Sequence, residues 1–495
     1  MLLDEPLIFE RGSTGRVGWQ MPADSWPAGP ELPSELRRED DLAGLPEVSE
    51  LEVLRHFVRM SQWNYSAATT LYPLGSCTMK YNPVVNEAMA RLPGFAGLHP
   101  LVPTSLAQGS LALLEALERA LAEVCGLDAV SLQPAAGAQG ELLGLMLVRA
   151  YHVDRGDARK RVLVPSSAHG TNPASAVLCG YAVTEVPVNA RGLLETRAVA
   201  AAMDESVAAL MVTNPNTLGL FEEEMEGVAE AVHARGGLLY MDGANMNALM
   251  GVAKPGHMGV DVMQFNLHKT FSTPHGGGGP GAGPVAVRAS LAEYLPVPRV
   301  MRHGDTLTWE DEAPKSVGRL HGFYGNFGIL VRAYAYIARL GGTGLAEATR
   351  MAVLNANYLR AQLRGHYHLP YDTPSLHECV FSDRDLAAYD VHTLDVAKRL
   401  LDRGFYAPTI YFPLVVKGAL MIEPTETETK ETLDEFVAAM IAIAAEASTD
   451  PDVVRNAPHS TRVSRLDETR AARHPVLRWR HPSDASHVHE NAGKN

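Results

Sequence analysis

Residues 264–287 read QFNLHKTFSTPHGGGGPGAGPVAV, a stretch that places one lysine between an apolar segment and a long run of glycines. The apolar residues Val262–Phe265 predict a short buried strand, and Lys269 follows it closely. Burial at the end of a core strand favours the neutral amine of a lysine, which is the form that makes an imine with an aldehyde. The glycines Gly276 to Gly279 allow the backbone to approach a flat ligand. The alternative is a surface lysine beside a flexible glycine loop.

Strand candidates recur upstream of this segment, and helical patterns separate several of them. Gln139–Tyr151 and Leu106–Cys125 carry apolar residues at helical spacing, and Gly126 stands where a helix C-cap is expected. Strands that alternate with helices predict an α/β fold whose mostly parallel sheet is covered on both faces. The strand candidates are Arg161–Val164, Ala208–Thr213, Gly237–Met241 and Val262–Phe265.

Changes in composition along the chain predict four parts. Residues 1–100 indicate an N-terminal arm with loops, and residues 101–325 a large domain. Residues 326–455 indicate a smaller α+β domain, which opens with an apolar helix ending at Gly341-Gly342 and contains a second helix near Leu433–Ala447. Residues 456–495 form a tail rich in Arg and His. We expect the tail to be solvated or to face a partner.

Charge and cysteine content exclude several classes of protein. The chain has 495 residues and a formal net charge of -14, which offers no basic surface for nucleic acid. Its four cysteines include no CxxC pair, which suggests a reducing compartment. The first residues carry acids and no basic region before an apolar stretch, so we expect no targeting signal and a cytoplasmic location. No apolar window approaches the ~20 residues of a membrane span.

Two further side chains follow predicted strands and share a sheet edge with Lys269. Asp242 ends the apolar segment GLLYMD, where a buried carboxylate requires a partner such as a protonated pyridine nitrogen. His169 lies in VPSSAHGTNPASA after the strand that ends at Val164, and its imidazole could stack on a ring or shuttle protons. The alternatives are a helix N-cap or surface acid for Asp242 and a structural role for His169.

A strand-to-helix turn supplies a candidate phosphate site. In LQPAAGAQGELLG, Gly137, Ala138 and Gln139 stand where free backbone N–H groups and the helix dipole favour an anion, although an ordinary turn has the same pattern. Asn214, in VTNPNTLG, could bond a phenolic oxygen of a cofactor or could simply form an Asn-Pro turn.

At these residues the sequence resembles the fold-type I superfamily of pyridoxal 5'-phosphate (PLP) enzymes, which have an aspartate aminotransferase-like large domain, and more closely the P-protein family of the glycine cleavage system. Several long motifs typical of that family occur in order over about residues 60–430. They are YPLGSCTMKYNP (72–83), QPAAGAQGE, SAHGTNPASA, NLHKTF with its glycines, GRLHGFYGNFG (318–328) and MIEPTETET (421–429).

The resemblance implies a role for each candidate residue. Lys269 would carry PLP covalently as a Schiff base and act in catalysis, Asp242 would pair with the pyridine nitrogen, and His169 would stack on the ring and act in catalysis. His268 joins the expected cofactor-binding set, together with the turn residues and Asn214. No metal site is expected. Cys77 lies within a family motif, and a buried inert thiol is at least as good an interpretation as a redox role.

The resemblance covers only the C-terminal half of the long single-chain P-protein, so the chain is similar to the second subunit of the two-polypeptide form. The implied partners are the first, N-terminal-half subunit in a heterotetramer, and the lipoylated H-protein. The implied oxidoreductase binds glycine as an external aldimine, releases CO2 and transfers the aminomethyl group to the lipoyl arm. The alternatives are another PLP-dependent amino-acid decarboxylase or lyase without lipoyl chemistry, and a noncatalytic half whose partner holds the cofactor.

Overall fold

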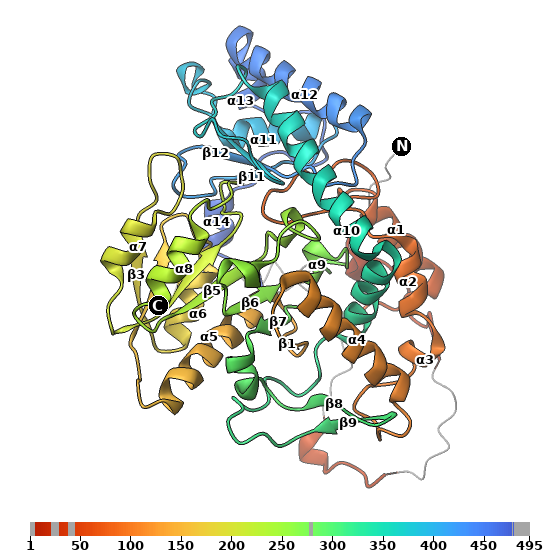
Figure 1. Ribbon diagram of the computed structural model, residues 1–495. Helices are drawn as coiled ribbons and strands as arrows, with labels where there is room; N and C mark the ends of the chain where they lie inside the picture. Colours follow the sequence, from red (N-terminus) through yellow and green to blue (C-terminus); the bar gives the residue numbers. More distant parts are fainter. Residues whose placement is uncertain (1–4, 21–28, 38–44, 277–280, 478, 480–495) are drawn as a thin grey trace, which may run out of the picture. The chain divides into compact units, whose positions relative to one another are not determined.

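The computed structural model describes residues 5–20, 29–37, 45–276, 281–477 and 479 (Figure 1). The predictions for Gly277, Gly278, Gly279 and for residues 478 and 480–495 of the C-terminal tail lie outside the described residues. The chain divides into two compact units. One unit is Ala67–Arg462, and the other joins Met1–Ser66 to Val463–Asn495.

A seven-stranded sheet forms the centre of the Ala67–Arg462 unit (Figure 1). The strand order is β1-β7-β6-β5-β4-β2-β3, in which the pairs from β6 to β3 are parallel and β7 runs antiparallel to both of its neighbours. The predicted, largely parallel sheet is therefore confirmed. The strands are β1 (Ala129–Ser131), β2 (Arg161–Pro165), β3 (Ala182–Val186), β4 (Val207–Thr213), β5 (Leu238–Gly243), β6 (Val262–Phe265) and β7 (Val285–Val287).

Helices cover both faces of this sheet, because alternate residues of each buried strand point to opposite sides. Leu210 and Met241 pack into the core shared with α4 and α8, whereas Met211 and Tyr240 pack into the core shared with α5 and α6. Gly126 ends α4 in the left-handed conformation (φ 72°), as its sequence position predicts. The helices that flank the sheet are α4 (Gln108–Cys125), α5 (Gly137–Asp154), α6 (Thr171–Leu178), α7 (Thr196–Ala202) and α8 (Met225–His233).

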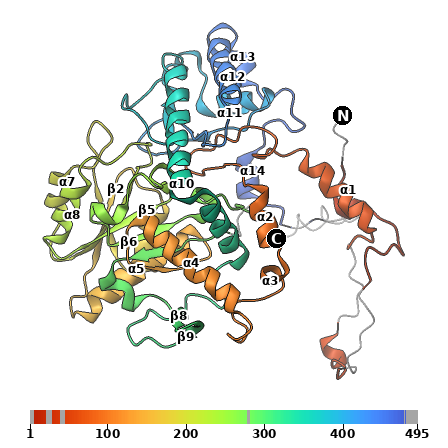
Figure 2. The ribbon, with the colours of Figure 1, turned by 45° about the vertical axis from the view of Figure 1, so that its right-hand side comes forward.

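Two helices differ in extent from the sequence prediction. Helix α5 starts at Gly137, two residues before the expected Gln139. Helix α10 (Phe327–Leu363) joins two helical segments across a kink at Gly341 (φ 59°, ψ -176°), so the first segment ends at the predicted Gly341-Gly342 and a second segment, which was not predicted, follows it. Glycine accepts this backbone geometry, so the chain bends there and resumes its helix. Figure 2 shows α4 beside the first part of α10.

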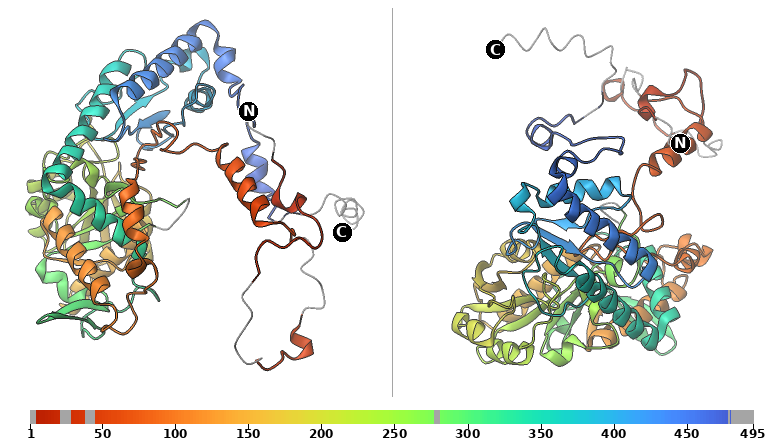
Figure 3. Two further views of the ribbon diagram at one scale, coloured as in Figure 1. Left: turned by 90° about the vertical axis from the view of Figure 1, so that its right-hand side faces the viewer. Right: turned by 90° about the horizontal axis from the view of Figure 1, so that it is seen from above.

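A second sheet with its own core follows α10 in the chain. Its strand order is β10-β12-β11 and both pairs are antiparallel. Phe381, Leu400 and Phe436 are among the buried residues of its core. Figure 3 shows α12 packed along α10. The elements are β10 (Cys379–Ser382), β11 (Thr409–Ile410), β12 (Ala419–Ile422), α11 (Thr393–Asp402), α12 (Lys430–Thr449) and α13 (Pro451–Arg455).

Shorter elements complete the Ala67–Arg462 unit. They are α2 (Val84–Ala90), α3 (Pro93–Ala96), α9 (Leu267–Thr270), the hairpin β8 (Arg299–His303) with β9 (Thr306–Glu310), and the 3-10 turns Met246–Ala248, Pro255–Met258, Ala289–Tyr294 and Ala387–Tyr389. Among the described residues, no helix has both the length and the apolar character that a bilayer span needs.

The unit formed by the two ends of the chain contains α1 (Glu50–Ser61), α14 (Glu468–Arg473) and the 3-10 turns Ile8–Glu10 and Ser34–Leu36. Ser49 caps α1 by accepting a hydrogen bond from Glu52 N. The buried Glu5 carboxylate is paired with His56, Arg59 and Arg11. The Phe9 ring stacks on Trp479 with a centroid distance of 5.2 Å, so residues from both ends of the chain build this unit.

Candidate active site

A cavity of about 180 Å³ lies where the parallel strands of the large sheet end. Asp242 is the last residue but one of β5, Thr213 ends β4, and Lys269 and His169 follow β6 and β2. The carboxyl ends of parallel strands meet at one edge, which is the usual ligand-binding edge of an open α/β sheet. The lining residues are Ser76, Gly137, Ala138, Glu141, His169, Thr171, Thr213, Thr217, Asp242, Ala244, Asn245, Asn266, His268 and Lys269.

Six of the eight predicted site residues line this cavity, and Gln139 and Asn214 do not. The Gln139 side chain folds back on its own turn, where its Oε1 accepts a hydrogen bond from Ala135 N at 2.7 Å. The fully buried Asn214 carboxamide accepts from Glu222 N at 3.0 Å and so holds the following loop. Cofactor contacts by these two residues stay predictions.

Lys269 lies on the short helix α9 and is half-buried, four residues beyond the end of β6, the strand that it was predicted to follow. The Asn266 carboxamide, in the orientation that satisfies both of its polar atoms, accepts from Lys269 Nζ at 3.1 Å and donates to the Phe265 carbonyl at 2.9 Å. The amine is therefore directed by a neighbour on its own segment.

Three donors surround the buried Asp242 carboxylate, which is 2% exposed. Oδ1 accepts from Ala244 N at 2.9 Å and from Gln264 Nε2, and Oδ2 accepts from Asn172 Nδ2 at 3.1 Å. The Tyr240 hydroxyl donates to Gln264 Oε1, which turns the Gln264 amide toward Asp242. Hydrogen bonds to a charged acceptor offset much of the cost of burying it.

Glu141 is a pocket residue that the sequence interpretation missed. Its Oε2 accepts from Asn172 Nδ2 at 3.0 Å and its Oε1 bonds to Thr171 Oγ1 at 2.9 Å. Burial, and then the nearby Asp242 charge, raise the pKa of Glu141 to about 7. Glu141 follows Gly137 by four residues, so the two share one face of α5. That spacing is the signal that could have found it.

His169 lies exposed at the mouth of the cavity and belongs to the same hydrogen-bonded network. Its Nδ1 is 2.7 Å from Thr171 Oγ1, and its ring meets Phe412 edge-on at a centroid distance of 5.5 Å. Partial burial lowers the pKa of His169, which favours the neutral imidazole.

A turn of unusual backbone conformation forms another wall. Ser76 (φ 66°) and Thr78 (φ 49°) adopt left-handed angles on either side of Cys77. The buried Glu378 accepts from Ser76 N at 2.8 Å, and the buried Glu423 accepts from Thr78 N at 2.9 Å. Burial raises the pKa of the Cys77 thiol, which keeps it protonated and supports the inert-thiol interpretation.

Unpartnered polar atoms and a glycine cradle indicate that this cavity suits the predicted cofactor. Thr213 Oγ1 and His268 Nδ1 are buried and have no hydrogen-bond partner among the described residues. A Cβ at Gly137 would lie 2.3 Å from the nearest atom of the Asn266 carboxamide, so any larger residue would displace that side chain. Gly137 also begins α5, whose first N–H groups lack partners within the helix and favour an anion. The residues present therefore fit a compact ring with a phosphate.

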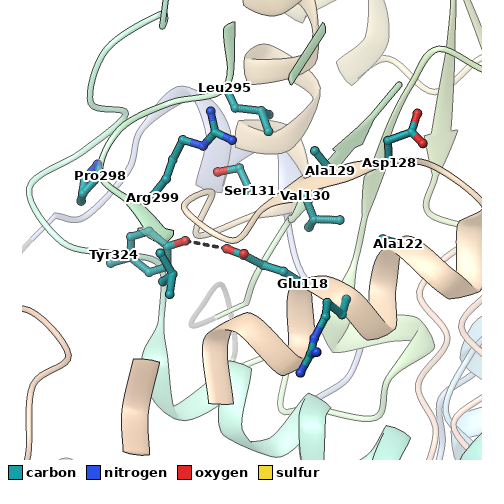
Figure 4. A pocket seen from close by; sticks show the side chains of 12 residues that line it. Glu118, Ala122, Asp128, Ala129, Val130, Ser131, Leu295, Pro298, Arg299 and Tyr324 are labelled. Atoms are coloured by element: carbon teal, nitrogen blue, oxygen red, sulfur yellow. Dashed lines mark hydrogen bonds between the residues drawn. The ribbon is translucent and has the colours of Figure 1, made fainter. Parts of the chain in front are cut away.

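Figure 4 shows a second cavity, of about 200 Å³, with a different set of groups. Its Glu118 carboxylate accepts from the Tyr324 hydroxyl at 3.0 Å, and Arg299 lines the same space. Burial raises the pKa of Glu118 to about 8. Neither a lysine nor a histidine is among the described residues that line this cavity, so it offers no amine for an imine. The lysine pocket is the candidate active site.

Two family models match the chain. The model described as "Glycine cleavage system P-protein" matches residues 28–305, and the one described as "Glycine dehydrogenase, C-terminal domain" matches residues 348–459.

The chain belongs to the glycine cleavage system P-protein family.

A P-protein relative from Exiguobacterium sibiricum, named "Probable glycine dehydrogenase (decarboxylating) subunit 2", is 54% identical over 489 residues, which cover 98% of this chain and 99% of that protein. The predicted membership of the P-protein family, in the form named subunit 2, is thus confirmed.

Solved structures confirm the fold class of this P-protein family member. A glycine decarboxylase (P-protein) of the glycine cleavage system, in inhibitor-bound form, has a TM-score of 0.70 at 23% identity, over 83% of this chain and 93% of that chain. An aspartate aminotransferase from Thermus thermophilus has a TM-score of 0.57 at 14% identity, over 76% of this chain and 99% of that chain. The aspartate aminotransferase-like fold was predicted.

Proposed function

We propose that this chain is the lysine-bearing, PLP-dependent subunit of a glycine dehydrogenase (decarboxylating), which releases CO2 from glycine and passes the aminomethyl group to a lipoyl arm. The observation that carries the proposal is the convergence of Lys269, Asp242 and His169 on one cavity at the sheet edge. The family and the name of the relative at 54% identity support the same activity.

Each residue has a role that its surroundings support. Lys269 Nζ would hold the cofactor aldehyde, and Asp242, kept as an acceptor by its three donors, would face the pyridine nitrogen. Gly137 and Ala138, at the start of α5, would face the phosphate. Bound there, PLP supplies an electron sink for the electrons that CO2 leaves behind.

The chain's own groups then control protons and water. Lys269 is the only lysine among the described residues that line the cavity, and its amine is placed to take and return a proton there. His268 has a pKa lowered to about 3, mainly by burial, and therefore stays neutral beside Lys269. Because His268 is neutral, it adds no positive charge that would repel a protonated Lys269 amine.

The proposal includes partners and a compartment. The subunit 2 name of the relative implies a second subunit, and we place this chain with that N-terminal-half subunit in a heterotetramer that receives the lipoylated H-protein. We place the complex in the cytoplasm. All four cysteines are free thiols, which is consistent with a reducing compartment.

Borohydride reduction of the holoenzyme followed by peptide mapping tests the proposal. We expect the label on Lys269, and we expect Lys269→Ala to lose both the label and the exchange of bicarbonate carbon with glycine by more than about 10³-fold, because a covalent attachment point cannot be replaced. Lys254→Ala is the control. Lys254 Nζ forms a surface ion pair with Glu123 Oε1 at 2.6 Å, and Lys254 is not among the residues that line the cavity.

Three results would contradict the proposal. A label on the partner subunit alone would make this chain a noncatalytic half. Exchange that survives in Lys269→Ala would remove the lysine from the chemistry. Full turnover without a lipoylated carrier would indicate a different PLP-dependent decarboxylase.

A further inference from the structure

We propose that Glu141, Thr171 and His169 form a proton relay that delivers a proton from Glu141 to the mouth of the lysine pocket at His169 Nε2. The recipient is the thiolate that the opened lipoyl disulfide releases, so the inference rests on the proposed function. Glu141 and Thr171 act through His169 and are positioning residues, whereas His169 meets the arriving substrate.

Each step of the relay lies within hydrogen-bonding distance. Glu141 Oε1 is 2.9 Å from Thr171 Oγ1, and Thr171 Oγ1 is 2.7 Å from His169 Nδ1. The Thr171 N–H also points at His169 Nδ1 at 3.3 Å. His169 Nε2 has no hydrogen-bond partner among the described residues, and the ring is exposed at the cavity mouth. An incoming sulfur can therefore reach Nε2 without crossing the pocket.

Two arrangements of protons fit this geometry. In the first, the protonated Glu141 donates to Thr171 Oγ1, the Thr171 hydroxyl donates to His169 Nδ1, and Nε2 carries a proton. In the second, the Glu141 carboxylate accepts from the Thr171 hydroxyl, Thr171 Oγ1 accepts from Nδ1–H, and Nε2 holds a lone pair. A hydroxyl oxygen can donate and accept at once, so Thr171 Oγ1 takes part in both arrangements, whereas the Thr171 N–H has Nδ1 as an acceptor only in the first.

The step between the arrangements balances. The Nε2–H bond of His169 breaks as the proton moves to the thiolate sulfur, which becomes a thiol. The Thr171 hydroxyl proton moves to Nδ1, and the Glu141 proton replaces it on Oγ1. One proton leaves Glu141, one arrives on sulfur, and neither His169 nor Thr171 changes charge. Because a thiol with a pKa of ~8.5 holds a proton more firmly than a carboxyl near neutrality, the transfer runs toward sulfur.

The charges around Glu141 explain why it is the group that stores the proton. Asp242 lies beside it, and Asn172 Nδ2 donates to both carboxyl groups. Asp242 accepts from two further donors, Ala244 N and Gln264 Nε2, whereas Glu141 shares Asn172 and bonds to a hydroxyl that can also accept. Two adjacent buried carboxyl groups do not both ionise easily. The proton therefore resides on Glu141.

The other titratable neighbours do not move the stored proton away from Glu141. Lys269 is the nearby cation for both Glu141 and His169, and its charge favours ionised Glu141 and neutral His169. The Tyr240 hydroxyl faces Glu141 from β5 and stays protonated, because burial raises the pKa of Tyr240 well above its usual value. A neutral His169 suits the relay, since the exchange of tautomers needs no imidazolium.

Infrared difference spectra of the full chain test the stored proton without any turnover. Between about pH 5 and pH 9 several buried carboxyl groups contribute to the protonated-carboxyl band, and we expect one component of it, with a midpoint near pH 7, to be lost in Glu141→Gln. Glu118→Gln is the matched control, because Glu118 is another carboxyl whose pKa is raised by burial, to about 8, outside the lysine pocket. If the Glu141→Gln difference spectrum equals the wild-type spectrum, Glu141 stores no proton and the inference is wrong.

Turnover of the complex with lipoylated carrier tests delivery. For Glu141→Gln we expect kcat to fall by roughly 10²-fold, the low end for the loss of a proton-transfer group, with a flattened pH profile near neutrality and little change in the KM for glycine. Thr171→Val breaks the relay at similar volume, and Thr171→Ser restores the hydroxyl, so we expect a loss with Val and a rescue with Ser. An unchanged pH profile in Glu141→Gln, or equal rates for the Val and Ser variants, would overturn the relay.

The two proposals fail separately. Lys269→Ala removes the cofactor attachment and leaves a Glu141 infrared titration, with its midpoint moved to higher pH because the Lys269 charge is gone. An absent imine on Lys269 with a normal Glu141 titration therefore counts against the proposed function and against the sulfur recipient. An intact imine with no Glu141 titration counts against the relay alone.

Discussion

The lysine pocket and the Glu118 cavity have similar sizes, about 180 and 200 Å³, and each contains a glutamate whose pKa is raised by burial. In the Glu118 cavity, the carboxylate accepts a hydrogen bond from Tyr324, which lies beside it in the fold (Figure 4). In the lysine pocket, Glu141 belongs to a chain of hydrogen bonds that reaches both Asp242 and His169.

The two cavities differ in the hydrogen bonds that link their polar groups, and not in size. Thr213 Oγ1 and His268 Nδ1 in the lysine pocket are buried without partners among the described residues, which is costly in a folded protein unless a ligand supplies the missing bonds. A glycine at the start of α5 leaves room for that ligand. In the Glu118 cavity, the carboxyl group is satisfied within the protein.

Asp242→Asn should have the largest effect on activity, and the matched change in the Glu118 cavity should have little. The side chain keeps its size but loses its charge, so we expect the rate of CO2 release from glycine to fall by roughly 10²–10³-fold, as when a preorganised electrostatic partner is lost. Asp128→Asn is the matched change in the Glu118 cavity, where Asp128 accepts from Ala289 N at 2.7 Å. Rates measured with saturating PLP that fall equally in both variants would remove the distinction between the cavities.

Gly137→Ala should have an intermediate effect. The new Cβ would lie 2.3 Å from the nearest atom of the Asn266 carboxamide, whose oxygen also accepts from Lys269 Nζ. Overpacking of this kind costs about 1–3 kcal/mol, so we expect PLP to bind roughly tenfold more weakly, as measured by fluorescence titration. Gly109→Ala, near the start of α4 with nothing within 4 Å of its Cβ, is the control and should bind PLP normally. Normal binding by Gly137→Ala would mean that the cradle is not needed.

Glu118→Gln should have the smallest effect, and it should appear in stability and not in activity. The pKa of Glu118 in the folded chain is raised to about 8, above its usual value of 4.5. Between these values the folded state retains a proton that the unfolded state has lost, so the wild type loses stability as the pH rises. The Tm advantage of the variant over the wild type should grow from pH 5 to 8 and then level off, as calorimetry can measure. A difference in Tm that does not change with pH would mean that the pKa of Glu118 is not raised in the folded chain, as for a carboxyl group in contact with solvent.

Sequence patterns predicted the residues that stand directly at strand ends. Asp242 and His169 follow apolar segments, and Lys269 follows another, so the rule for parallel sheets is enough to place all three at one edge. Asn214 and the backbone N–H of Gln139 were predicted from turns that follow strands, with an ordinary turn as the alternative for both. Their side chains turn toward Glu222 N and Ala135 N instead, because nearby backbone donors compete for each carboxamide.

The sequence by itself determined the α/β fold, the family and the lysine, because each depends on local periodicity or on long motifs in order. The tertiary structure alone decided that Glu141 bonds to Thr171 and shares Asn172 with Asp242, and that Glu378 and Glu423 hold the Ser76–Thr78 turn. Those contacts join residues far apart in the chain, and a hydrogen bond between such residues leaves no periodic trace in a single sequence. The pKa of a buried carboxyl likewise depends on which groups folding brings beside it.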